Sequence, residues 1–193
     1  MFGYIEGKLV ALSPTHTYLE VNGIGYDVQI TLNTYEAIQN EKSCRLYTHL
    51  QIREDAWTLY GFATEKERTA FQRLLSISGV GAATARILLS SLTPKDLTSI
   101  VFSGDSRALE KVKGIGAKTA QRIILELKGK LPVEMATELN GISHNTTEQD
   151  ALNALIGLGI GKSMAQAALN KSKTSAGKES SVEDRIKEAL KCL

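Results

Sequence analysis

The chain has 193 residues, more than the roughly 100 to 150 of a usual single domain, so two or three small domains are expected. It contains no run of about 18 apolar residues, so the sequence predicts no membrane-spanning helix. Its first residues lack the basic and apolar regions of a secretory signal, so we expect a cytoplasmic protein. Cys44 and Cys192 lie far apart without the spacing of metal ligands, so we expect no disulfide framework, no metal site and no cofactor.

The nearly balanced total of 23 basic and 21 acidic residues hides an uneven distribution along the chain. Residues 1–63 carry 4 basic and 7 acidic side chains, and residues 134–193 carry 7 and 8. Residues 64–133 carry 12 basic and 6 acidic side chains, a net charge of +6. Such asymmetry is expected when one domain binds a polyanion, although basic helical faces are often only solvated. Charge alone leaves both interpretations open.

The first 63 residues show the pattern of a small β domain. Short runs rich in β-branched and aromatic residues alternate with turn signals, among them Asn22-Gly23. We expect strands at residues 4–12, 17–21, 25–31, 44–52 and 57–62, with a short helix at 32–39. Five strands with one interposed helix fit a Greek-key barrel such as the OB fold, and an SH3-like barrel fits almost as well.

From Thr64 the apolar period changes from two to 3.6, which predicts an all-helical domain over residues 64–133. Thr64 opens a capping box in which Glu67 is expected to reach back to the helix start, and this helix should run to about Ser76. Further helix starts are predicted at Thr93-Pro94 and near Asp105, because these residues suit the N-terminus of a helix.

The rest of the chain divides into a spacer and a tail. Residues 134–146 are small, polar and aperiodic, which is typical of a flexible linker. Residues 147–193 predict a three-helix, UBA-like domain, with helices at 148–156, 162–171 and 182–193 and a spacer at 172–180. The predicted fold class is therefore a multi-domain α+β protein with an OB-like barrel, a helical domain and a three-helix tail.

The helical domain contains an internal repeat with an offset of 35 residues. The segments 74–85 and 109–120 align, and each is centred on a glycine–hydrophobic–glycine motif: Gly79-Val80-Gly81 and Gly114-Ile115-Gly116. Each copy predicts a helix that ends at the first glycine, a tight turn with a buried central residue, and a second helix that starts at once. Glycine suits this turn because a Cβ would restrict its torsions and obstruct close approach.

Two such hairpins predict binding to phosphate groups. The N–H groups at the start of the second helix lack partners and lie at the positive end of the helix dipole, so they can bind an anion. A single copy is equally well explained by a turn without a ligand, but two copies can meet both strands of a duplex across its minor groove. Basic side chains add phosphate contacts, and no helix offers the array that base readout requires. The residues expected to contact DNA are Gly79, Val80, Gly81, Ala82, Thr84, Arg86, Gly114, Ile115, Gly116, Lys118, Thr119 and Arg122.

With these features the sequence resembles the RuvA family, the Holliday-junction-binding subunits of RuvAB branch-migration complexes. The resemblance rests on the opening run 1–7, on Arg53-Glu54-Asp55-Ala56 followed by residues 59–62, on both hairpins and on the order of the domains. It covers essentially the whole chain and implies a tandem helix-hairpin-helix domain. One departure is Ala83, where the family often has a lysine, and Arg86 is a candidate to replace that phosphate contact.

The resemblance implies a non-catalytic role in recombination and DNA repair, in which the protein binds Holliday junction DNA, holds it open and recruits a motor. It implies a homotetramer, with one or two tetramers on a junction, and as partners a RuvB-like hexameric ATPase and a RuvC-like resolvase. By themselves Glu54 and Asp55 predict only a polar turn. In the family this turn is an acidic pin that repels phosphates at the crossover.

The tail domain is too small to bury all its apolar side chains, and an exposed apolar patch usually marks a partner surface. Candidates for contacting the motor are Leu155, Leu158, Ile160 and Leu190. For Leu155 and Leu190 a place in the helical core is an equal alternative. Leu158 and Ile160 flank a glycine-rich loop, where side chains project outward more readily, so these two are favoured as contacts. Residues 157–163 look like a Walker A motif but lack its first glycine and a preceding strand, so we expect a connection between helices.

The alternative from a different class is the DNA-docking subunit of a structure-specific nuclease or glycosylase. The scattered His16, His49 and His144 suggest no catalytic set, and adjacent acids on one turn diverge in direction, so catalysis is not favoured. Trp57 and Tyr60 lie in the last predicted strand, which favours barrel core or a subunit interface over base stacking.

Overall fold

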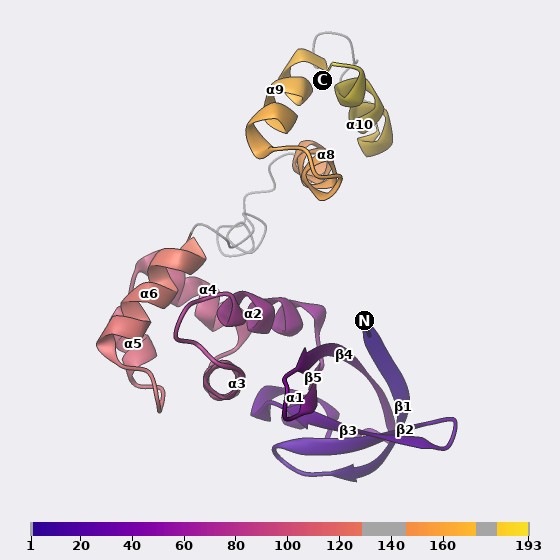
Figure 1. Ribbon diagram of the computed structural model, residues 1–193, viewed down its shortest axis with the longest axis vertical. Coiled ribbons are helices and arrows are strands. Elements are labelled where there is room, and N and C mark those ends of the chain that lie inside the picture. The colour runs from indigo at the N-terminus through magenta and orange to yellow at the C-terminus, as the bar shows by residue number, and fades with distance from the viewer. Residues whose placement is uncertain (1, 129–145, 173–180, 193) are drawn as a thin grey trace. The chain divides into compact units, whose positions relative to one another are not determined.

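The computed structural model describes residues 2–128, 146–172 and 181–192 (Figure 1). These residues fall into two compact units, one on each side of residues 129–145. Within the described ranges, no helix has the length and apolar character needed to span a bilayer. Except for their end residues Thr146 and Ser172, the predicted linker 134–146 and spacer 172–180 lie outside the described residues.

The N-terminal unit begins with a closed barrel, seen in the lower half of Figure 1. The order of its strands is β1-β2-β3-β5-β4, in which β3 and β5 run parallel and the other neighbours antiparallel. Helix α1 (Leu32–Ile38) connects β3 to β4. The bounds are β1 Tyr4–Leu12, β2 His16–Val21, β3 Ile24–Ile30, β4 Ser43–Ile52 and β5 Trp57–Phe62. This order, with a helix between the third and fourth strands, is that of the OB fold, so the structure selects the OB fold over the SH3-like barrel.

The helical part of the same unit follows directly. Its helices are α2 (Glu65–Leu75), α3 (Ala82–Ser91), α4 (Pro94–Ser103), α5 (Ser106–Glu110) and α6 (Ala117–Lys128). The predicted N-caps are confirmed, because the side chains of Thr64, Thr93 and Asp105 each accept a hydrogen bond from a backbone N–H of the first turn. In α4 the capping box with Asp96 is complete.

Glu67 has other partners than the capping box predicts. Its carboxylate is buried, with 3% of the residue exposed, and accepts hydrogen bonds from the hydroxyls of Thr31 and Thr34 on the barrel side. Burial raises the pKa of this carboxyl group, and the hydrogen bonds from Thr31, Thr34 and the backbone of Ala63 partly offset that rise. The carboxylate turns away from its own helix because α2 packs on the barrel, where buried hydroxyls need an acceptor.

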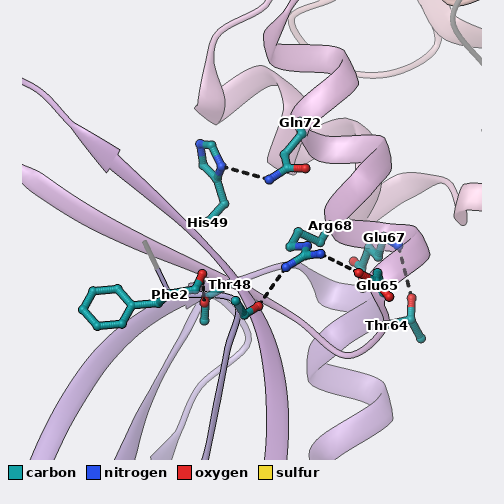
Figure 2. Close-up of polar contacts among 9 residues, drawn as sticks. Phe2, Thr48, His49, Thr64, Glu65, Glu67, Arg68 and Gln72 are labelled. Atoms are coloured by element: carbon teal, nitrogen blue, oxygen red, sulfur yellow. Dashed lines mark hydrogen bonds and ion pairs between the residues drawn. The ribbon is translucent and has the colours of Figure 1, made fainter. Parts of the chain in front are cut away.

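Further contacts fasten α2 to the barrel, as Figure 2 shows. Arg68 donates from Nη1 to the carbonyl oxygen of Gly3 at 2.8 Å, and a second bond within α2, from Nη2 to Oε1 of Glu65 at 2.6 Å, holds the guanidinium in place. The ring of Phe71 packs against Phe62 and Tyr60, with ring centroids 4.9 and 5.0 Å apart. The helical core therefore extends into the barrel, and the two segments predicted as separate domains pack as one unit.

The C-terminal unit consists of α8 (Thr146–Gly157), α9 (Lys162–Ser172) and α10 (Val182–Lys191), which confirms the predicted three-helix fold. Each of the three helices packs on the other two. Its small core consists of buried alanine and leucine side chains. They are Ala151, Leu152, Leu155, Ala165, Ala168, Leu169 and Ala189.

Candidate nucleic-acid interface

The two predicted hairpins have the same backbone geometry. Gly79 in the first has a φ of +90° and Gly114 in the second has a φ of +89°. In the first turn the N–H of Val80 donates to the carbonyl of Ile77 at 3.0 Å, and in the second the N–H of Ile115 donates to Val112 at 3.1 Å. The positive φ explains the first glycine of each motif, because other residues are strained there.

The turns are longer than the sequence indicated. Helix α2 ends at Leu75 and α5 at Glu110, so neither helix reaches the first glycine of its motif. The N–H of Ile77 bonds to Leu74 at 3.1 Å, and that of Val112 bonds to Leu109 at 3.0 Å. These short-range bonds tighten the chain after each helix and bring the apolar residue of the turn into the core.

The second glycine of each motif serves a different purpose. Gly81 has an ordinary φ of −87°, and a Cβ built on Gly81 or on Gly116 would meet no atom within 4 Å. Strain in the turn therefore does not require a glycine at either position, contrary to expectation. The missing side chains leave open surface at the start of α3 and α6, where a phosphate could approach the backbone closely.

The start of α3 offers hydrogen-bond donors to an outside group. The first N–H groups of a helix have no acceptor within the helix, and Gly81 as N-cap has no side chain that could accept from them. The positive end of the helix dipole adds to their attraction for an anion.

The side chains predicted to contact DNA differ in their exposure. Val80, Ala82 and Ile115 are buried, so these residues can meet a ligand only through their backbone. Lys118 is exposed at the start of α6, as predicted. Lys113, which directly precedes Gly114 and is also exposed, was not among the predicted residues, although a basic residue next to the glycine motif was a signal for it. The remaining side chains, Thr84 and Thr119, are partly buried.

Two predicted arginines make contacts within the protein. Arg122 on α6 donates from Nη1 to the carbonyl oxygen of Ser78 at 3.0 Å and so connects the second hairpin to the first. Arg86 on α3 donates from Nη1 to Oε1 of Gln29 on the barrel at 2.6 Å. Neither partner was predictable, because each lies more than 40 residues away in sequence. The geometry lends no support to Arg86 as a replacement for a lysine at Ala83.

The acidic pair lies at the tip of the β4–β5 hairpin. The N–H of Arg53 donates to the carbonyl of Ala56 at 2.9 Å and closes the turn, while Glu54 and Asp55 are exposed. Trp57, which begins β5 after the turn, is 76% exposed, so of the two predicted alternatives the barrel core does not apply to it and the subunit interface stays a prediction. Tyr60 packs on Phe71. Among the residues that the structure describes, no three His, Cys, Asp or Glu side chains form a group that could hold a metal ion.

The C-terminal unit divides the predicted motor contacts. Leu155 is fully buried in the core, so it is not available as a contact, and Ile160 packs partly against that core. Leu158 and Leu190 are 64% and 43% exposed, and the exposed Met164 and Ile156 join them although the sequence did not single them out. The glycine-rich segment lies between α8 and α9, as predicted.

An OB barrel packs here against two helix-hairpin-helix turns, and the surface at the start of each outgoing helix is open. This combination defines a class of protein that binds the phosphate backbone of nucleic acid. Comparison with family models agrees with this class. Residues 1–61 match the RuvA N terminal domain, residues 71–130 a SAM-like helix-hairpin-helix tandem, and residues 147–193 the RuvA C-terminal domain. The chain belongs to the RuvA family.

Curated relatives support this assignment over the whole length. A protein of Christiangramia forsetii is 44% identical over 194 residues, which cover all of both chains. A protein of Porphyromonas gingivalis is 42% identical over 203 residues, again covering all of both chains. One of Bacteroides fragilis is 42% identical over 178 residues, 88% of this chain and 89% of that one. Each of these relatives is named Holliday junction branch migration complex subunit RuvA.

Proposed function

We propose that the protein binds Holliday junction DNA in the cytoplasm without sequence preference, holds the junction open and recruits an ATPase for branch migration. It acts as a non-catalytic subunit in recombination and DNA repair. The relatives named as branch migration complex subunits support this proposal. The alternative is a DNA-docking subunit of a structure-specific nuclease or glycosylase.

The observation that carries the proposal is the pair of matched hairpins within one compact unit. Both have a glycine with open space around it directly before the outgoing helix, and the bond from Arg122 to Ser78 joins them. Two anion sites held at a fixed spacing suit two phosphates of a DNA backbone. Lys113 and Lys118 add positive charge to the second hairpin without reading bases.

The exposed carboxylates of Glu54 and Asp55 supply the preference for a junction. Negative charge at this turn repels phosphates, so it is tolerated where the strands of a crossover part and disfavoured on continuous duplex. A homotetramer, alone or in pairs on one junction, would gather four such turns at its centre. The exposed pair Ile52 and Trp57, opposite each other on β4 and β5, supports an interface beside the turn.

The partners that we propose are a RuvB-like hexameric ATPase and a RuvC-like resolvase. Leu158 is the favoured motor contact, because it is exposed at the α8–α9 turn. The variant Leu158→Asp should keep its helical circular dichroism and lose ATPase recruitment. The matched variant Ile160→Asp should unfold this unit, because Ile160 packs against its core. Full recruitment by a folded Leu158→Asp protein would remove this residue from the proposed surface.

The test of the function itself compares an immobile four-way junction with a linear duplex of equal length, in magnesium. We expect tighter binding to the junction, independence from arm sequence, and no cleavage. Affinity should fall steeply with salt, because each neutralised phosphate contributes roughly −0.9 to the log–log slope. Equal affinity for both substrates would refute the proposal, and strand cleavage would establish the alternative.

A further inference from the structure

Helix α3, whose start forms the phosphate site of the first hairpin, is bonded to the barrel at its middle. Nη1 of Arg86 donates to Oε1 of Gln29 on β3 at 2.6 Å and, at the longer distance of 3.4 Å, to the carbonyl oxygen of Thr15. That carbonyl also accepts from the N–H of Ile30, so the arginine joins an existing contact between β3 and the turn before β2. Arg86 and Gln29 are both partly buried, which shields their bond from water.

The far end of α3 is bonded to the barrel as well. Nδ2 of Asn33 on α1 donates to the carbonyl of Leu89 at 2.6 Å and to that of Leu92 at 3.2 Å. The backbone N–H of Leu32 donates to Oγ of Ser90 at 3.1 Å. Carbonyls in the last turn of a helix have no partner within it, so α1 caps the end of α3. Hydrogen bonds at two places along its length therefore connect α3 to the barrel and α1.

These bonds connect the first hairpin to the acidic turn by a short path. Gln29 on β3 is in register with Tyr60 on β5, and β5 begins at Trp57, directly after the turn that holds Glu54 and Asp55. The path from the carboxylates to α3 therefore runs along β5, across its pairing with β3, and through the bond between Gln29 and Arg86.

We propose that Arg86 is a positioning residue, which together with Gln29 fixes the first hairpin relative to the acidic turn and so produces the preference for a junction. The proposal rests on the function proposed above. A linear duplex needs the hairpins alone, whereas a junction has to meet the hairpins and the acidic turn at the same time. Loosening α3 should therefore weaken junction binding more than duplex binding.

A direct phosphate contact by Arg86 is the competing explanation, and salt dependence separates the two. Loss of a phosphate contact lowers the salt slope by roughly 0.9, as we expect for the exposed Lys118→Met. Loss of a positioning bond leaves the number of neutralised phosphates unchanged. Arg86→Met should therefore keep the wild-type salt slope on duplex DNA.

The partner residue provides the sharper test, because Gln29 lies on the barrel and carries no charge. Gln29→Ala removes the acceptor and leaves Arg86 in place. We expect it, like Arg86→Met, to lower the ratio of junction to duplex affinity about fivefold, within the range of mutations that alter coupling between sites. Gln29→Glu keeps an acceptor for the guanidinium and should retain the wild-type ratio. The double variant of Gln29→Ala and Arg86→Met should lose no more than the single ones, since both break one bond.

The measurements are fluorescence-anisotropy titrations of the full chain with both substrates at several salt concentrations, alongside a thermal melt of each variant. A wild-type ratio in Gln29→Ala, together with a reduced salt slope in Arg86→Met, would overturn the proposal and restore Arg86 as a phosphate contact. If Arg86→Met does not fold, the two Gln29 variants decide between the explanations, because Gln29→Glu would neutralise a phosphate-binding arginine and weaken both substrates. Failure of the proposed function shows separately, as a wild-type chain without junction preference.

Discussion

At the scale of single residues, the two glycines of each hairpin have separate physical reasons. Gly79 and Gly114 adopt a positive φ that the turn requires, while a Cβ at Gly81 or Gly116 would meet no atom of the protein. The first position therefore concerns the stability of the fold and the second concerns access to the helix start. The same substitution made at the first and at the second glycine should therefore separate the two roles.

Gly81→Ser should leave the fold intact and weaken junction binding. Serine is at least as good an N-cap as glycine, and its hydroxyl would occupy N–H groups that a phosphate needs. We expect an unchanged or higher melting temperature and an affinity about tenfold lower, as loss of one hydrogen bond to a charged group predicts. Gly79→Ser is the matched control, because strain at positive φ should cost about 1 to 3 kcal/mol of stability. Wild-type affinity in Gly81→Ser would argue against backbone recognition at this site.

Glu67 predicts a measurable dependence of stability on pH. Its pKa is raised in the folded chain, chiefly by burial, so its contribution to stability is fully present below the unfolded pKa and is lost as pH rises through the folded pKa. We therefore expect the unfolding free energy of the wild type to rise relative to that of Glu67→Gln as pH falls from about 7 to about 4. Urea titrations of both proteins across this range measure it, and a difference independent of pH would contradict the assignment.

At the scale of elements, the β4–β5 hairpin carries charge at its tip and an exposed apolar pair, Ile52 and Trp57, directly beside the tip. Neutralising the tip with Glu54→Gln and Asp55→Asn should leave the barrel folded, because both side chains are exposed. Binding to linear duplex should tighten, since repulsion between unit charges and nearby phosphates is removed, and the preference for a junction should shrink. Electrophoretic mobility shifts with both substrates provide the comparison. An unchanged preference would exclude the turn from junction recognition.

Elements set by local chemistry were predictable from the sequence. The OB-like barrel is confirmed, all five strands fall within a residue or two of their predicted ranges, and the caps at Thr64, Thr93 and Asp105 are confirmed. The doubled glycine motif located both hairpins because its spacing is local. The partners of Glu67, Arg86 and Arg122 were not predictable, since they depend on which distant elements pack together. The choice between barrel core and subunit interface for Trp57 was not predictable, because a strand pattern does not show where the barrel ends.

At the scale of the whole molecule, the two compact units predict separable activities. Both hairpins, the barrel and the excess positive charge belong to the first unit, and the exposed Leu158 belongs to the second. A chain that ends after Pro132 should bind the junction with nearly wild-type affinity and fail to recruit the ATPase. Binding titrations and an ATP-driven branch-migration assay test the two halves of this prediction. A large loss of junction affinity would show that the second unit also contacts DNA.

The exposure of Trp57 gives the protein a built-in optical reporter. The chain contains one tryptophan, so all indole fluorescence originates beside the acidic turn. With 76% of the residue exposed, the isolated subunit should emit at the long wavelengths of hydrated indole and be quenched readily by acrylamide. If subunits meet beside this turn, diluting the protein until the assembly dissociates should shift the emission to longer wavelengths and increase quenching. Both changes should follow the fall in the measured mass of the assembly. An emission spectrum that stays constant while the mass changes would place the subunit contacts elsewhere.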